Sequence, residues 1–134
     1  MSFTKNWPEY ITRELVLEQH ELMLRKYGGA SGIRDEGLLA SALALPEQSA
    51  FGEAMYPTPH DQAAAFTVSL VCNHPFIDGN KRTAIRVSAA WLFMNGYHRT
   101  ATDDETYAFI VEVAEGKIDM DAAKVWYCRN YRPA

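Results

Sequence analysis

Residues 59–73 constrain the fold most strongly, because their side chains are apolar almost all the way round a helix. Thr58, Pro59 and Asp61 form the pattern of a helix N-terminus, with a capping threonine and a proline in the first turn. The apolar members that follow are Ala63, Ala64, Ala65, Phe66, Val68, Leu70 and Val71. A helix with so little polar surface is covered by neighbouring elements on every side. We therefore expect residues 59–73 to form a central, buried helix.

Helix signals dominate the rest of the chain, while strand signals are weak. The patterns predict further helices over 8–27, 35–45, 80–94, 102–116 and 119–130. Short extended pieces are expected only within the proline-rich loop 46–60 and within 97–101. A length of 134 residues suits one hydrophobic core. The sequence therefore predicts an all-α fold, a single compact domain over residues 1–134 with about six helices around one buried helix.

Charge and hydropathy exclude several classes of protein. The net charge is −4 and the pI is about 5.5, which argues against direct nucleic-acid binding through a basic surface. No apolar run approaches the roughly 20 residues that span a bilayer, so no membrane partner is expected. The N-terminal residues lack the apolar segment of a signal peptide. The two cysteines lack metal-binding spacing, which favours reduced thiols and a cytoplasmic location.

A loop between two predicted helices gathers most of the residues capable of chemistry. It reads His74-Pro-Phe76-Ile-Asp78-Gly79-Asn80-Lys81-Arg82-Thr83 and continues through Ala-Ile to Arg86. The first N–H groups of a helix have no backbone partner, so a helix that begins near Asn80 favours an anion there. Gly79 permits a positive φ and a close approach of the backbone to that anion.

The cations and the carboxylate of this loop suit a magnesium polyphosphate. Arg82 can donate two N–H groups to phosphate oxygens, and Arg86 lies one turn further along the same helix face. Lys81 adds another positive charge at the start of this helix. Asp78 is the only carboxylate in the loop, and Mg²⁺ commonly binds one or two carboxylates together with phosphates.

The remaining polar residues of the loop complete a site for group transfer. His74 can accept a proton near neutral pH, as a general base for an incoming hydroxyl. Asn80 can donate to a phosphate oxygen or to a metal-bound water, and Phe76 is expected to point inward and anchor the loop. A single histidine usually has no such role, so His20 and His98 are interpreted as surface polar groups. His60 is interpreted as a helix-start residue.

The loop resembles a known motif. The pattern His-Pro-Phe-x-Asp-Gly-Asn-x-Arg-x-x-Arg is similar to that of the Fic family, and the segment 80–83 (NKRT) is similar to its Doc branch, the death-on-curing toxins. The segment 28–35 (GGASGIRD) and Asn95-Gly96 extend the likeness over roughly residues 10–128. The resemblance implies a compact helical Fic/Doc fold. It also implies a toxin of a type II toxin–antitoxin pair, restrained by a cognate antitoxin on a separate chain.

The resemblance also implies roles and a reaction. His74 would be the general base, Asp78 the magnesium ligand, and Asn80 and Arg82 phosphate-binding residues alongside Gly79 and Lys81. The loop 46–60 would be a flap that holds a protein substrate. Doc toxins transfer the γ-phosphate of ATP to a threonine of elongation factor Tu and so arrest translation, with Mg²⁺ as cofactor.

Two alternatives stay open at this point. Fic enzymes that transfer AMP have glycine where this chain has Lys81, yet Arg86 matches an arginine of the full Fic pattern that meets the γ-phosphate. The first alternative is therefore AMP transfer to a protein hydroxyl. The second is a non-enzymatic module that binds nucleic acid or another anion along Lys81, Arg82 and Arg86. The chain contains no Ser/Thr-x-x-x-Glu-Gly/Asn element, the inhibitory motif that some Fic proteins carry.

Overall fold

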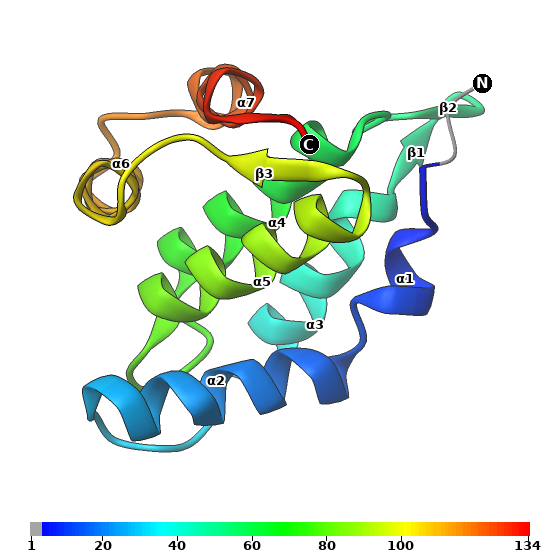
Figure 1. Cartoon of the computed structure of the whole chain (residues 1–134). Coiled ribbons are helices and arrows are strands. Elements are labelled where there is room, and N and C mark those ends of the chain that lie inside the picture. Colours follow the sequence, from blue (N-terminus) through cyan, green and yellow to red (C-terminus); the bar gives the residue numbers. More distant parts are fainter. Residues whose placement is uncertain (1–3) are drawn as a thin grey trace.

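The computed structural model describes residues 4–134, and Figure 1 shows that they form a mostly helical molecule. Seven α-helices and four short strands occur in this part of the chain. The helices are α1 (Trp7–Tyr10), α2 (Arg13–Tyr27), α3 (Glu36–Ala44), α4 (Pro59–Asn73), α5 (Asn80–Met94), α6 (Asp103–Ala114) and α7 (Met120–Asn130). A 3₁₀ turn, η1 (Leu45–Glu47), follows α3. The predicted helical fold class is confirmed.

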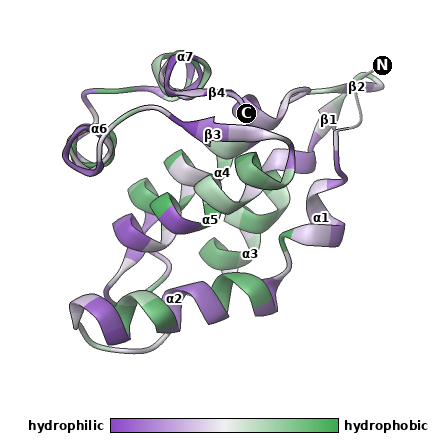
Figure 2. Cartoon of the chain, in the orientation of Figure 1, coloured by the Kyte–Doolittle hydropathy of each residue, from purple (hydrophilic) through white to green (hydrophobic). Residues whose placement is uncertain are grey.

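Helix α4 is the centre of the fold. Ten of its fifteen residues are buried, and it contacts α3, α5, α6 and α7. The Thr58 hydroxyl accepts the N–H of Asp61 and caps the helix, as the sequence predicts. In Figure 2 hydrophilic residues alternate with hydrophobic ones along the outer helix α2, whereas α4 is mainly hydrophobic. The expectation of a central buried helix over residues 59–73 is confirmed.

The first predicted helix is two helices in the structure. Thr12 has an extended backbone, and its hydroxyl accepts the N–H of Leu15, so it caps α2 and separates it from α1. The break lets the side chain of Trp7 enter the core, where its ring lies 5.5 Å from that of Phe66 and 5.1 Å from that of Trp91. This break makes seven helices among the described residues, one more than predicted.

The strands form two antiparallel pairs; three of the four strands lie where short extended pieces were expected, and the fourth, residues 131–133, was not predicted. Strands β1 (Ser49–Ala50) and β2 (Glu53–Ala54) make a small hairpin before α4. Strands β3 (Tyr97–Arg99) and β4 (Tyr131–Pro133) pair the end of α5 with the end of the chain. Helix α4 is joined to the second pair by His60, which is nearly buried and bonds the carbonyl of Tyr131 at 3.0 Å.

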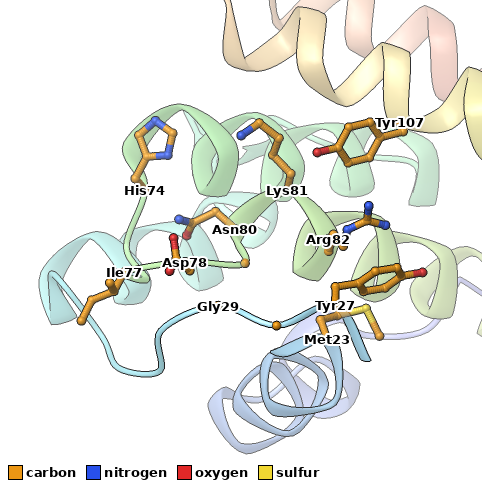
Figure 3. Close-up of a pocket in the computed structure, with 12 residues that line it drawn as sticks. Met23, Tyr27, Gly29, His74, Ile77, Asp78, Asn80, Lys81, Arg82 and Tyr107 are labelled. Carbon is orange, nitrogen blue, oxygen red and sulfur yellow. The ribbon is translucent and has the colours of Figure 1, made fainter. Parts of the chain in front are cut away.

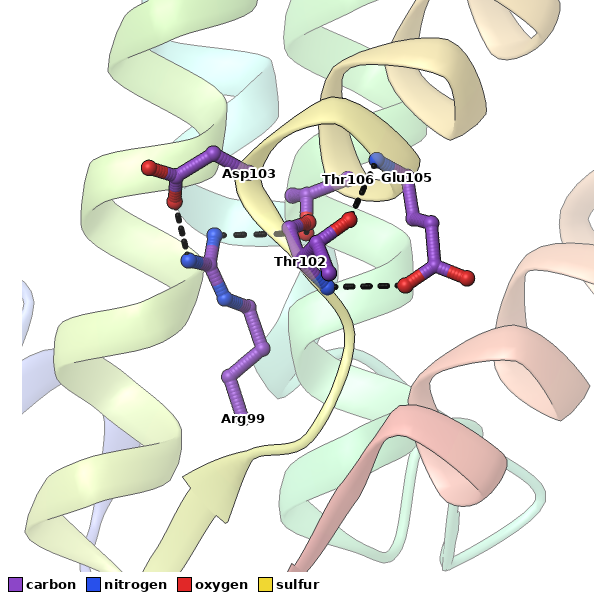
Figure 4. Close-up of polar contacts among 5 residues, drawn as sticks. All are labelled: Arg99, Thr102, Asp103, Glu105 and Thr106. Carbon is purple, nitrogen blue, oxygen red and sulfur yellow. Dashed lines mark hydrogen bonds and ion pairs between the residues drawn. The ribbon is translucent and has the colours of Figure 1, made fainter.

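Helix α6 is held in place at its N-terminus (Figure 4). The Thr102 hydroxyl accepts the N–H of Glu105, and the Glu105 carboxylate accepts the N–H of Thr102, which completes a capping box. Arg99, on β3, donates to Asp103 and to Thr106. These contacts position α6 beside α5, where it forms one wall of the site described next. No described helix is long and apolar enough to cross a membrane.

Candidate active site

The predicted loop lies between the end of α4 and the start of α5. His74 ends α4 with a left-handed backbone (φ 50°), and Gly79 precedes α5 with φ 84°. These two residues turn the chain round a pocket of about 460 Å³, and Figure 3 shows the side chains that line it. The predicted site residues on its wall are His74, Asp78, Gly79, Asn80, Lys81 and Arg82. The other lining residues come from α2, its following turn, the loop and α6.

The start of α5 supplies an anion-binding end to this pocket. The backbone N–H groups of Asn80, Lys81 and Arg82 belong to the first helical turn and lack acceptors within the helix. The Lys81 amine extends from this turn toward the His74 side of the pocket (Figure 3). Unpaired N–H groups, the helix dipole and an ammonium group together favour phosphate oxygens.

Arg82 is held between two aromatic rings. Its guanidinium carbon lies 3.6 Å from the ring centre of Tyr27 on α2 and 4.8 Å from that of Tyr107 on α6. Figure 3 shows it between the two rings at one end of the pocket. Stacking of this kind restricts the orientation of a guanidinium while its N–H edges stay available for an anion. The aromatic pair was not predicted from the sequence.

The side chain of Asn80 has a different position from the one predicted. It is nearly buried, its Oδ1 accepts the N–H of Phe76 at 3.0 Å, and its amide donates to the Phe76 carbonyl at 3.0 Å. Both ends of the amide are therefore occupied by the loop itself. The backbone of Asn80 contributes to the helix terminus, whereas its side chain closes the loop. Phe76 is 1% exposed, so its side chain points into the core, as expected.

Asp78 is exposed on the pocket wall, and its carboxylate oxygens are of the kind that Mg²⁺ prefers as ligands. One carboxylate oxygen, Oδ2, accepts the N–H of Ala30 at 2.7 Å, which fixes the direction of the side chain. No cluster of three or more metal-binding side chains occurs among residues 4–134. A magnesium ion that binds together with nucleotide phosphates needs only one or two protein carboxylates, so the single carboxylate fits this ion.

Arg86 lies outside the pocket that contains His74. It lines a neighbouring hollow of about 320 Å³ between α2, α5 and α6, and its Nε donates to Gln19 at 2.9 Å. The two hollows share Arg82 and its two tyrosines. The structure therefore brings the other predicted site residues together and places Arg86 next to them, beyond the stacked guanidinium.

Two residues outside the motif hold the loop and were not predicted to do so. The interpretation of His20 as a surface group is wrong, because His20 is 4% exposed and its ring stacks on Phe76 at 3.8 Å. Its Nε2 bonds the carbonyl of Asp78 at 2.8 Å. Arg34 donates to the carbonyls of Asn73 and His74 at 2.6 and 2.7 Å. Arg34 belongs to the GGASGIRD segment, so it had a signal, whereas His20 had none.

The loop 46–60, expected to be a flap that holds a protein substrate, does not border this pocket. The β1–β2 hairpin precedes Pro59, while His74 follows the last residue of α4, and fifteen helical residues span about 22 Å. No residue of the hairpin lines the pocket. The segment 28–35 borders it instead, since Ile33 forms a β-bridge with Phe76 and the N–H of Ile77 donates to the Gly32 carbonyl.

Comparison with known proteins agrees with this arrangement. The sequence profile of the Fic/DOC family matches residues 10–92, which is more than half of the chain and includes the whole loop. The chain is 39% identical over 116 residues to a protein named Toxin Doc from Mycolicibacterium smegmatis. The alignment covers 85% of this chain and 87% of that protein.

Proposed function

The chain belongs to the Fic/DOC family, and from this premise we propose that it is a Doc-like toxin with protein kinase activity. Its reaction is transfer of the γ-phosphate of ATP to a hydroxyl side chain of a translation factor. By resemblance to Doc toxins, that factor is elongation factor Tu and the result is arrest of translation. Toxins of this family are enzymes that transfer nucleotide or phosphate groups. The proposal for this chain specifies the group, a phosphate, and the acceptor, a translation factor.

The chemistry follows from the residues on the pocket wall. The acceptor hydroxyl gives its proton to the His74 imidazole as its oxygen forms a bond to the γ-phosphorus. The bond between that phosphorus and the oxygen bridging to the β-phosphate breaks, and ADP leaves with the bonding electrons. The start of α5, Lys81 and Arg82 hold phosphate oxygens in line. Asp78 would hold Mg²⁺, which offsets phosphate charge when it is bound.

The observation that carries this proposal is the position of Lys81. Its side chain starts at the helix terminus and lines the same pocket as His74 and Asp78. In AMP-transferring Fic enzymes the matching residue is glycine, which leaves bare backbone for the α- and β-phosphates. A lysine at this position fills that space and adds a positive charge to the pocket of His74. This charge favours binding of the γ-phosphate, rather than the α-phosphate, next to the base.

AMP transfer is the second candidate, because Arg86 is present. In the full Fic pattern this arginine meets the γ-phosphate. In this structure Arg86 lies in the neighbouring hollow and is bonded to Gln19. In the AMP-transferring orientation the γ-phosphate would meet Arg86 and the α-phosphate would face His74. The two candidates therefore differ in which end of the triphosphate faces the base.

We also propose that a cognate antitoxin restrains the enzyme. The printed name of the relative describes a toxin, and the sequence has no inhibitory motif of its own. An extended or helical segment of the antitoxin that lies in a groove of this chain would restrain the enzyme. Co-expression with the antitoxin is expected to restore growth that the toxin alone arrests.

Labelled ATP tests the proposed reaction. Purified elongation factor Tu is incubated with the protein, Mg²⁺ and ATP that is labelled on either the γ- or the α-phosphate. Transfer of the γ-label alone is expected, and Lys81→Gly should lower it and favour the α-label. Transfer of the α-label by the unchanged protein would replace the kinase with an AMP transferase. Absence of both labels from this factor would reject it as the substrate.

A further inference from the structure

Two side chains outside the motif hold different halves of the catalytic loop by its backbone. Arg34 contacts the first half, at Asn73 and His74, and His20 contacts the second half, at Phe76 and Asp78. Arg34 lies 40 residues before His74 and His20 lies 58 residues before Asp78. Neither side chain lines the pocket that contains the base. Both therefore act on the reacting groups only through the loop.

Arg34 stabilises the backbone conformation that presents the base. The last carbonyls of a helix have no intrahelical partner and lie at its negative end, so a guanidinium is favourable there. Arg34 donates from Nε to the His74 carbonyl at 2.7 Å and from Nη2 to the Asn73 carbonyl at 2.6 Å. His74 has φ 50°, which is unusual for a residue with a Cβ. This forked contact holds a strained residue in place.

His20 fixes the second half of the loop, which contains Asp78 and Gly79. A carbonyl oxygen only accepts, so Nε2 of His20 must carry the proton that it donates to Asp78 at 2.8 Å. The His20 ring lies parallel to that of Phe76, at an interplanar angle of 10°. A Cβ on Gly79 would come within 3.3 Å of the His20 ring, so the packing is tight on this side as well.

We propose that Arg34 and His20 are positioning residues with separable effects on the reaction. Arg34 sets the place of the His74 imidazole and so acts on the chemical step. His20 sets the place of the Asp78 carboxylate and of the α5 terminus, and so acts on the binding of Mg·ATP. The assignment of the two effects rests on the proposed function, whereas the hold on the loop does not.

Matched variants separate the effect of the hydrogen bonds that hold the loop from the effect of side-chain size. Arg34→Lys keeps the charge but has one nitrogen where the guanidinium donates to two carbonyls. Arg34→Ala removes both side-chain bonds and keeps the bond from the backbone N–H of residue 34 to the Pro75 carbonyl. His20→Phe keeps a ring against Phe76 but lacks the donor, and His20→Gln returns an N–H to the same region. The exposed Arg25 of α2 and the exposed His98 of β3 supply the controls Arg25→Ala and His98→Phe.

Steady-state kinetics with elongation factor Tu and Mg·ATP give the first readout. Arg34→Ala is expected to lower kcat by about 10–100-fold with KM for Mg·ATP within about threefold, because a misplaced base slows chemistry without loosening the nucleotide. Arg34→Lys should fall between it and the wild type. His20→Phe is expected to raise KM for Mg·ATP by about tenfold, and His20→Gln should recover most of it. The two controls should match the wild type.

Amide hydrogen exchange gives a second readout that needs no ligand and no reaction. Arg34→Ala should speed exchange at the His74 amide, and His20→Phe should speed it at Phe76 and Ile77, with the core of α4 unchanged. If the variants show these local changes while the wild-type protein transfers nothing, the proposed function is rejected and the positioning roles stand. Variants that transfer phosphate and exchange like the wild type would overturn the positioning roles alone. Uniformly faster exchange in α4, with kcat and KM altered together, would also overturn them in favour of a general loss of stability.

Discussion

Replacement of Asn80 by alanine tests whether the Asn80 side chain binds phosphate or holds the loop in its folded conformation. As a phosphate-binding side chain, Asn80 would affect nucleotide binding and leave the free energy of unfolding unchanged. In the structure its amide bonds both the N–H and the carbonyl of Phe76 in a nearly buried position. The geometry therefore predicts that Asn80→Ala destabilises the fold, with lost activity as a consequence.

The size of the effect follows from those two bonds. Each neutral hydrogen bond contributes about 0.5–1.5 kcal/mol net, and each buried backbone group left without a partner costs about 1–3 kcal/mol. Some water can enter beside the exposed residues of the loop, so we expect a loss of about 2–4 kcal/mol in the free energy of unfolding. For a chain of this length that corresponds to a fall in Tm of at least about 6 °C.

Thermal unfolding and calorimetric titration with Mg·ATP are measured on the same samples. A suitable control is Asn95→Ala, because Asn95 also bonds backbone groups, those of Lys5 and Trp91, but lies at the far end of α5. The control should lose stability and keep its affinity for Mg·ATP. An Asn80→Ala protein with unchanged Tm and weakened Mg·ATP binding would refute the reasoning and return Asn80 to the phosphates.

Three further predictions concern stability. Phe66→Ala removes a fully buried ring from α4 and should cost about 3–5 kcal/mol in chemical denaturation, whereas a loss below about 1 kcal/mol would contradict a central α4. Hydrogen bonds from the backbone and hydroxyl of Thr102 hold the pKa of the Glu105 carboxyl below its usual 4.5. The stabilisation is therefore present above about pH 4.5 and lost as pH falls through the lower folded pKa, so Glu105→Gln should be less stable at pH 7 and converge with the wild type in acid, as followed by Tm. Burial raises the pKa of Tyr131 to about 12 and also raises that of Tyr127, so stability should fall as pH rises from about 10 to about 12. Tyr131→Phe should reduce that decline without removing it; an unchanged slope would exclude Tyr131 as a contributor.

Elements with local end signals were predictable from the sequence. The bounds of α4 and α5 follow from Thr58-Pro59 and from Asn95-Gly96, because caps and stops are set by residues next to each other in the chain. The break before α2 was not predicted, because Thr12 lies inside an apolar pattern that continues across it. A capping hydroxyl at such a position is recognisable only once the backbone is known to be extended there.

The candidate site was predictable where its residues are consecutive, and not where distant segments meet. The loop from His74 to Arg82 lines one pocket, as expected from its spacing. The contacts of His20 with Phe76 and Asp78 depend on the packing of α2 against the loop, which no local pattern reports. For the same reason, the sequence predicted that the Asn80 side chain binds phosphate. Its bonds to Phe76 can be recognised only when the folded conformation of the loop is known.

The intact mass of purified elongation factor Tu after incubation with this protein, ATP and Mg²⁺ tests the central claim most directly. The account predicts a gain of one phosphate group, which His74→Ala reduces by about 10²–10⁴ in rate because it removes the general base. A gain of one AMP would contradict the proposed orientation of the nucleotide. A factor that stays unmodified, or a phosphate gain that persists at full rate without His74, would contradict the substrate or the base.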